Sequence, residues 1–196
     1  MDFTTSYTGP ILPGADLLPN RLGAKRTLHG IVENNVGTLW IMNSVFDRLQ
    51  NGIRSDFSSA LVYDCNFKDI SCTDATRSLP DLPVTYCSPS YAVGDAIAYF
   101  NPSGTASGLT VLNSIFENIH GTAIRLSGTD FSSILYDNTM INVGVGINSS
   151  QLLKDPATPD KPFHDMKNNN INHIGGGILL DLMGEIELNI ERNTIS

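Results

Sequence analysis

The stretch Asn113-Ser114-Ile115-Phe116 sets out a pattern that recurs along the chain: a polar residue and a small one lead, two positions on, into a large apolar residue. An isolated unit of this kind cannot bury its apolar face, so successive units must stack on one another. The sequence is therefore that of a repeat protein. The other five copies are Asn43-Ser44-Val45-Phe46, Asp64-Cys65-Asn66-Phe67, Asp137-Asn138-Thr139-Met140, Asn168-Asn169-Asn170-Ile171 and Arg192-Asn193-Thr194-Ile195.

The spacing and texture of these units indicate a β-solenoid. The large residues are separated by 21, 49, 24, 31 and 24 residues, which is a unit of 21 to 24 residues with insertions in the second and fourth units. Asn, Gly, Ser and Asp fill the gaps between apolar residues, and these residue types disfavour helix interiors. Residues 185–190 alternate Glu or Asn with Ile or Leu, which is the period of a β-strand. Short strands joined by turns and stacked by parallel pairing predict a parallel β-helix.

When the units are aligned on the large residue, equivalent residues fall into columns. If the units stack, the side chains of each column lie directly above one another. One column is apolar and is expected to face inward: Ile41, Val62, Val111, Leu135, Met166 and Ile190. A second column is small or amide-bearing and is expected to hydrogen-bond along the stack at a turn: Ser44, Cys65, Ser114, Asn138, Asn169 and Asn193. Further aliphatic columns are Leu49, Ile70, Ile119, Val143 and Ile174, and Ile53, Ile124, Ile147 and Ile178. A short outward column of alternating charge is Asp47, Lys68 and Glu117.

From about Leu28 to Ser196 the pattern resembles the right-handed parallel β-helix repeats of the pectate-lyase-like superfamily. The resemblance implies an all-β, right-handed parallel β-helix of about six coils with two loop insertions. It also implies a secreted or cell-surface protein of a kind that often meets polysaccharide. We divide the chain into an extended N-terminal segment or partial cap, 1–27, and a β-helix domain, 28–196, expected to be part of a longer chain or an assembly.

Composition narrows the classes of partner. The chain has 196 residues, of which 41% are hydrophobic, enough for one continuous core. A net charge of −8 argues against nucleic acid and anionic membranes as partners. No apolar run is long enough to span a bilayer, and residues 1–14 lack the features of a signal peptide. The protein is therefore either intracellular or exported by a leader outside this sequence, and we favour export.

The two insertions, about 71–93 and 149–162, are expected to carry individual function as projecting loops. In the first, Tyr86 and Tyr91 are candidates for stacking against sugar rings, and otherwise the loop is a tolerated surface excursion. Cys72 and Cys87 bracket most of this loop, and a disulfide between them would add about 3 kcal/mol, although the sequence leaves their pairing open. Cys65 is expected to be a buried structural residue.

The sequence offers candidate residues for a catalytic site but lacks the complete motifs of a known enzyme class. Polygalacturonase-type motifs fail here, because Asp-Asp and Arg-x-Lys are missing and Ile119-His120-Gly121 matches the histidine motif only in part. The candidates for a lyase or glycosidase site are Asp95, Glu117, His120 and Arg125, with a salt bridge between Asp95 and Arg125 as the alternative. No cofactor is expected apart from calcium, for which Glu185, Glu187 and Glu191 form an acidic row that otherwise serves to solvate an exposed strand.

The last residues, 193–196, finish inside a unit. We therefore expect either continuation of the chain or end-to-end self-association. The favoured function is a structural or adhesive module that presents loops, with glycan as a candidate partner. A polysaccharide lyase or glycoside hydrolase is the first alternative, and a subunit of a fibre or phage-type spike is the second.

Overall fold

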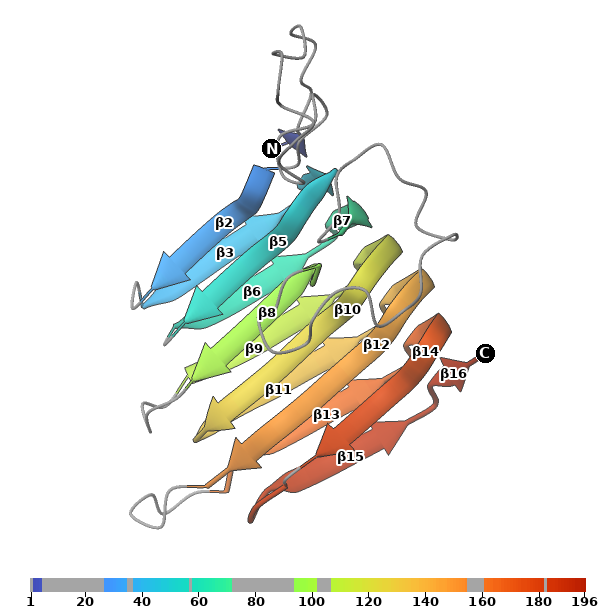
Figure 1. The fold of residues 1–196 in the computed structure, drawn as a ribbon. Helices are drawn as coiled ribbons and strands as arrows, with labels where there is room; N and C mark the ends of the chain where they lie inside the picture. The colour runs from blue at the N-terminus through green and yellow to red at the C-terminus, as the bar shows by residue number, and fades with distance from the viewer. Residues whose placement is uncertain are drawn as a thin grey trace, which may run out of the picture.

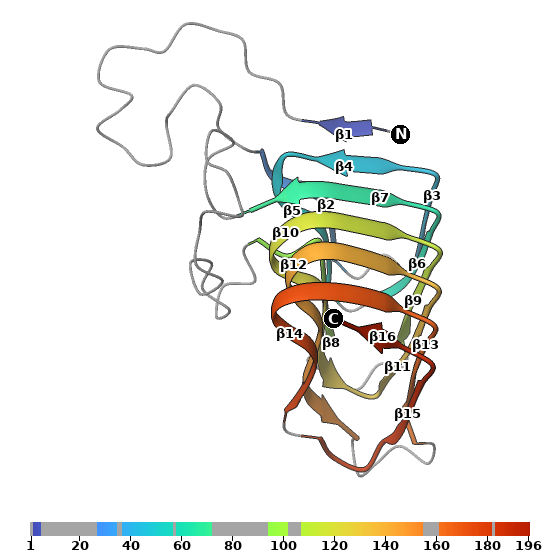
Figure 2. The ribbon, with the colours of Figure 1, turned by 90° about the vertical axis from the view of Figure 1, so that its right-hand side faces the viewer.

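The computed structural model describes residues 2–4, 27–34, 37–56, 58–71, 94–101, 107–154, 161–181 and 183–196. Every regular element in these ranges is a β-strand, and the strands form two sheets in which all pairs are parallel. Successive coils lie one over another (Figures 1 and 2), which confirms the predicted parallel β-helix.

Sheet A has ten strands: β1 (Asp2–Thr4), β2 (Thr27–Asn34), β4 (Val45–Asp47), β5 (Leu49–Asp56), β7 (Asn66–Ile70), β8 (Ile97–Asn101), β10 (Ile115–Thr129), β12 (Thr139–Leu153), β14 (Asn170–Asp181) and β16 (Thr194–Ile195). Sheet B has six strands: β3 (Thr38–Met42), β6 (Ser59–Tyr63), β9 (Ser107–Leu112), β11 (Phe131–Tyr136), β13 (Phe163–Lys167) and β15 (Glu187–Glu191).

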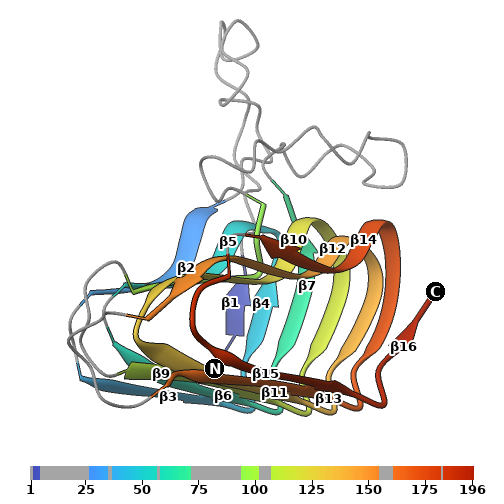
Figure 3. The ribbon, with the colours of Figure 1, turned by 90° about the horizontal axis from the view of Figure 1, so that it is seen from below.

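Each coil passes through sheet A in two segments and then through sheet B. The first segment carries the large apolar residue and is called the anchor segment. In the long strands β10, β12 and β14 the anchor segment continues directly into the second segment, whereas β4 and β7 are followed by separate strands β5 and β8. Sheet B lines one side of the molecule, and the anchor segments rise from it (Figure 3). The described strands thus form six coils, and β16 begins another.

The anchor residues stack in register, as the repeat predicts. Phe46 pairs with Phe67, and Phe67 with Phe116. The rings of Phe46 and Phe67 are parallel within 6°, with their centroids 4.6 Å apart, and those of Phe67 and Phe116 are 4.9 Å apart. All three side chains are fully buried. The column continues through Met140, Ile171 and Ile195.

The inward column of sheet B is also confirmed. Its strands pair without a register shift from Ile41 to Ile190. Five of the six side chains are at most 5% exposed. Ile190 is 43% exposed because no described strand stacks beyond β15. The continuation or self-association expected at this end stays a prediction.

The aliphatic columns of sheet A hold with one exception. Ile53, Ile97, Ile124, Ile147 and Ile178 pair in sequence. Ile174, however, is 51% exposed, so the expectation that it joins the Leu49 column is wrong. The register between β12 and β14 shifts here, and Val143 pairs with His173 instead.

The turn from sheet B into the anchor segment, which we call the amide corner, carries the predicted ladder. Asn138 Nδ2 donates to Asn169 Oδ1 at 3.0 Å, and Asn169 Nδ2 donates to Asn193 Oδ1 at 2.9 Å. Each Oδ1 also accepts the backbone N–H of the coil before, and each Nδ2 also donates to a carbonyl of sheet B, as Asn169 does to Leu135 O. Ser114 and Cys65 continue the ladder with shorter side chains.

The residue before each ladder position adopts a left-handed backbone conformation. This region is uncommon for residues other than Gly, but Asn and Asp tolerate it best. The repeat supplies Asn or Asp in five of the six coils, and Arg192 is the exception. The residues and their φ angles are Asn43 (48°), Asp64 (52°), Asn113 (51°), Asp137 (57°), Asn168 (55°) and Arg192 (54°).

The bend between the two segments of sheet A is called the insert corner. The anchor segments β1 and β7 end before this corner, and the second segments β2 and β8 begin after it; residues 5–26 and 72–93, which join them in the sequence, lie outside the described residues. The division of the chain at 27/28 stays a prediction, but the structure adds that β1 pairs in parallel with β4. In the second predicted insertion, residues up to Leu153 continue β12, and residues 155–160 lie outside the described residues.

Candidate binding face

The predicted catalytic pair, Asp95 and Arg125, is in contact but buried. Arg125 Nε lies 2.6 Å from Asp95 Oδ2, and Nη2 lies 3.3 Å from Oδ1. Asp95 Oδ1 also accepts the Thr122 backbone N–H at 2.7 Å. Asp95 is 1% exposed and Arg125 8%. Both carboxylate oxygens therefore hold the insert corner together, which is the arrangement of a structural ion pair.

The two remaining catalytic candidates lie in different surroundings. His120 is 4% exposed, with its Nδ1 3.2 Å from Ser71 Oγ. Glu117 occupies the predicted outward column beside Lys68. Because Asp95, His120 and Arg125 are all more than nine-tenths buried, they do not line an open groove in which a sugar chain could bind.

A polar network at the insert corner was missed by sequence reasoning. Asn51 Oδ1 accepts the backbone N–H groups of Gly94 at 3.1 Å and Asp95 at 3.3 Å. Asn51 Nδ2 lies 3.2 Å from His29 Nδ1. Burial, together with the charge of Arg54, lowers the pKa of His29. The network links the first coils to the Asp95–Arg125 pair.

The acidic row proposed for calcium is spread along an exposed strand. Glu187 and Glu191 occupy outward positions of β15, and Glu185 precedes it. Glu191 forms ion pairs with Lys167 at 3.7 Å and Arg192 at 3.3 Å. Across the part of the chain that the structure describes, no three His, Cys, Asp or Glu side chains gather closely enough to hold a metal ion.

Four predicted residues, Tyr86, Tyr91, Cys72 and Cys87, lie outside the described residues, so the sugar-stacking and disulfide hypotheses stay predictions. Cys65 is a free, buried thiol in the amide ladder. Burial raises its pKa.

The outward side of sheet B, which we call the sheet B face, was also missed. Each of its six strands has three residue positions on this face, because successive residues of a strand alternate between its two sides. The three outward columns, read from β3 to β15, are Thr38, Ser59, Gly108, Ser132, Phe163, Glu187; Trp40, Leu61, Thr110, Ile134, Asp165, Asn189; and Met42, Tyr63, Leu112, Tyr136, Lys167, Glu191.

The two ends of this face differ in character. At the β3 end, Trp40 is 70% exposed and Met42 46% exposed, beside partly exposed Leu61 and Tyr63. At the β15 end the outward residues are acidic or amide-bearing. Aromatic and aliphatic side chains, interrupted only by Thr110, therefore form a surface in the Trp40 and Met42 columns over β3, β6, β9 and β11, and charged side chains follow it at β13 and β15.

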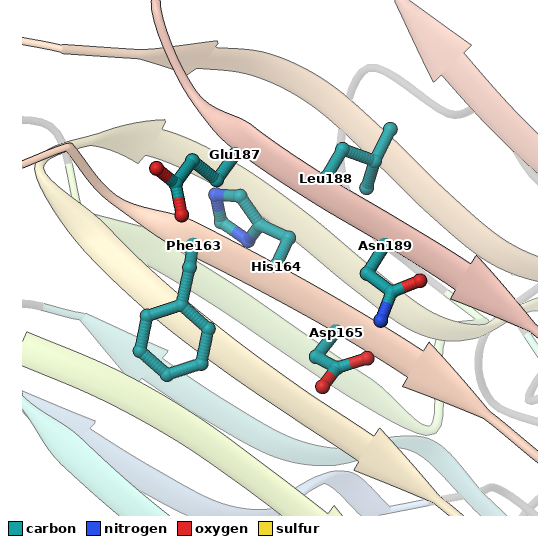
Figure 4. A pocket seen from close by; sticks show the side chains of 6 residues that line it. All are labelled: Phe163, His164, Asp165, Glu187, Leu188 and Asn189. Carbon is teal, nitrogen blue, oxygen red and sulfur yellow. The ribbon is translucent and has the colours of Figure 1, made fainter.

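An open depression of about 470 Å³ lies at the polar end, between β13 and β15. Phe163 and Asp165 project to one side of β13 and His164 to the other (Figure 4). Phe163 is 43% exposed, and Asp165, Glu187 and Asn189 also line the depression. An aromatic ring beside carboxylate and amide groups offers both a stacking surface and hydrogen-bonding partners.

A charged cluster connects the depression to the rest of the face. The Tyr136 hydroxyl donates to Asp165 Oδ2, and Lys167 Nζ lies 3.0 Å from the same oxygen. Burial alone would raise the pKa of Asp165, but the hydrogen bonds from Tyr136 and Lys167 and the Lys167 charge lower it. The bond to Asp165 raises the pKa of both Tyr136 and Lys167. Asp165 is thus a carboxylate and Lys167 an ammonium at neutral pH.

One signal in the sequence could have indicated the face. Residues 39–42 form an unbroken apolar run, Leu-Trp-Ile-Met, in which both sides of the strand are apolar. Such a run is typical of a strand that is covered on both sides. Among the described residues, cover is found on the inward side of this strand alone.

In comparisons with family models, with curated proteins and with solved structures, nothing matched the chain. The fold therefore rests on the chain's own register and stacking. Among the described residues no helix is long and apolar enough to cross a membrane.

Proposed function

We propose that the chain is a non-catalytic, adhesive β-helix module of a secreted or cell-surface protein, and that it binds glycan on the sheet B face. The observation that supports this function is the 70% exposure of Trp40 at the middle outward position of β3. A large aromatic side chain is seldom left this open next to further apolar side chains unless the surface binds something.

The rigidity of the sheet suits this role. Trp40 projects from a strand paired with β6 through five residue pairs, so little conformational freedom remains to be lost on binding. A flat indole offers apolar area to the C–H face of a sugar ring. The hydroxyls of Thr38 and Ser59 lie in the neighbouring column and both donate and accept hydrogen bonds.

The size of the face favours a narrow ligand over a second folded protein. Six strands about 4.8 Å apart, each with about 16 Å of length, give roughly 500 Å². A stable protein interface buries about 800 Å² on each partner. An elongated polymer such as a glycan needs no more than a strip of this surface.

Catalysis has weaker support. A lyase or glycosidase needs acid, base or cation groups that reach one sugar bond. Asp95 and Arg125 are instead paired and buried. We therefore favour binding without turnover over a lyase or glycosidase.

Glycan-array binding with wild type and Trp40→Ala tests the proposal. We expect wild type to bind a subset of glycans and Trp40→Ala to lose more than about fivefold in affinity, the effect of removing an interface anchor. Ile141→Ala is the matched control, because Ile141 is 46% exposed on sheet A and should leave binding unchanged. Absence of any glycan binding by wild type, or equal binding by Trp40→Ala, overturns the proposal. Release of reducing or unsaturated sugars from a bound glycan would show that the site is catalytic.

A further inference from the structure

The shape and charge of the sheet B face narrow the class of ligand. We propose that the face binds an uncharged, extended polysaccharide whose chain runs along the stack, across the strands, from Trp40 towards Phe163. This inference rests on the proposed function and adds to it the direction and the charge class of the glycan.

The direction follows from the dimensions of the apolar surface. Along the stack it covers four strands in the Trp40 and Met42 columns, broken only by Thr110, which is three spacings or roughly 14 Å. Along a single strand it covers two outward positions, which are about 7 Å apart. A chain molecule that lies across the strands therefore buries about twice the length of apolar surface.

A second aromatic side chain lies further along the stack, in the column next to that of Trp40. Phe163 stands on β13, four spacings or roughly 19 Å from β3. Ser59 and Ser132 lie between Thr38 and Phe163 in the outermost column, and the Phe163 backbone N–H donates to Ser132 Oγ at 3.2 Å. An oligosaccharide of several units thus meets an aromatic ring at each end and hydroxyls between them.

The charge of the face excludes acidic polysaccharides. Its outward positions carry three carboxylates, Asp165, Glu187 and Glu191, and one cation, Lys167. That cation is already paired with Asp165 at 3.0 Å and with Glu191 at 3.7 Å. The whole chain carries a net charge of −8. A uronic-acid or sulfated chain would meet like charge with no free cation on this face.

Neutral sugars fit the same groups. Their hydroxyls donate to Asp165 and Glu187, and they both donate to and accept from the amide of Asn189. Because the ligand has no charge, binding should depend little on ionic strength.

Isothermal titration of the purified chain tests the ligand class. The probes are neutral hexasaccharides (cellohexaose, chitohexaose and mannohexaose), the matching disaccharides, polygalacturonate and heparin. We expect at least one neutral hexasaccharide to bind, at least tenfold more tightly than its disaccharide and with less than a twofold change between 50 and 500 mM salt. Trp40→Ala and Phe163→Ala should each weaken it more than fivefold, and Ile141→Ala should not.

The outcomes separate this inference from the proposed function. If polygalacturonate or heparin binds in a Trp40-dependent manner and neutral glycans do not, the face is a glycan site but the charge class is wrong. If Trp40→Ala matters and Phe163→Ala does not, or if the disaccharide binds as tightly as the hexasaccharide, the direction along the stack is wrong. If no glycan binds, both proposals fail, and Trp40-dependent dimerisation or vesicle binding would identify the occupant. Equal thermal unfolding of all variants controls for folding.

Discussion

At the amide corner each coil places a small or amide side chain at the same position, whereas at the insert corner neighbouring coils contribute side chains of different chemical types. In the Asn138–Asn169–Asn193 ladder, the amide of each coil hydrogen-bonds to the equivalent amide of the next coil. The insert corner joins His29, Asn51, Asp95 and Arg125 into a network with no repeated element. It is also the corner between β1 and β2 and between β7 and β8, where the sequence carries its longest connections. A self-similar ladder fixes the length of its turn, while a network of unlike side chains can close turns of different length.

The strongest test of this contrast breaks the buried pair. Asp95→Ala leaves Arg125 charged and buried, and leaves the Thr122 N–H without its acceptor, so we expect a loss of about 3–5 kcal/mol in the free energy of unfolding. Urea denaturation measures it. Arg54→Met is the matched control, because the Arg54–Asp56 pair is 3.0 Å long but its Arg54 side chain is 41% exposed, and its loss should cost at most about 1 kcal/mol. Equal effects in the two variants would contradict a special role for the insert corner.

The pH dependence of the free energy of unfolding shows which part of the coil titrates. Burial lowers the pKa of His164 from 6.5 to about 4, so the unfolded state binds a proton in this range that the folded state does not. Stability is therefore complete above pH 6.5 and is lost as the pH falls towards 4, by about 3 kcal/mol in all. His164→Gln should flatten this slope.

The pKa of His29, at the insert corner, is also lowered, so protonation of this residue contributes a smaller loss of stability in the same pH range. The Asn members of the amide ladder have no ionisable side chain, so Asn169→Ala should shift the curve without changing its slope. A slope in His164→Gln that is as steep as in wild type would refute the assignment.

The amide ladder itself is tested by Asn169→Ala. The change leaves the Asn138 N–H and the Leu135 carbonyl without their partners in a buried turn. We expect a loss of about 2–3 kcal/mol in urea denaturation. Asn172→Ala, at an exposed amide, should stay within about 0.5 kcal/mol of wild type. If both variants behave alike, the ladder does not stabilise the fold.

The smallest effect is expected from Cys65→Ser. The neighbours of Cys65 in the column are Ser44 and Ser114, and the Cys65 Sγ contacts the Ile41 and Tyr63 carbonyls that a serine hydroxyl would also reach. The free energy of unfolding should change by less than about 0.5 kcal/mol. Cys65→Leu, which has no donor and is larger, should cost about 1–3 kcal/mol by overpacking. A large loss in Cys65→Ser would show that the column does not accept equivalent side chains.

The same contrast explains what the sequence could predict. The anchor column and the amide ladder follow from repetition alone, since similar residues at the same position of each unit stack in a parallel coil. The contact between Asp95 and Arg125 could be predicted from the sequence, but the choice between a catalytic and a structural role could not. That choice depends on the burial of the pair, which is set by how the insert corner closes. Ile174 was misplaced because a register shift in β14 has no marker in the repeat. The sheet B face was missed because the run 39–42 reads as a fully covered strand.

Because the register of sheet B has no shift, the length of the β-helix can change independently of its cross-section. Removing residues 139–169 would join Asn138 directly to Asn170, leaving Leu135 below Ile190 and Asn138 below Asn193 in the same columns. The molecule could shorten or lengthen by whole turns while its width and its turn chemistry stay the same. Duplication of a single turn within the gene would therefore extend the rod, and with it the reach of the sheet B face, without changing the register of sheet B.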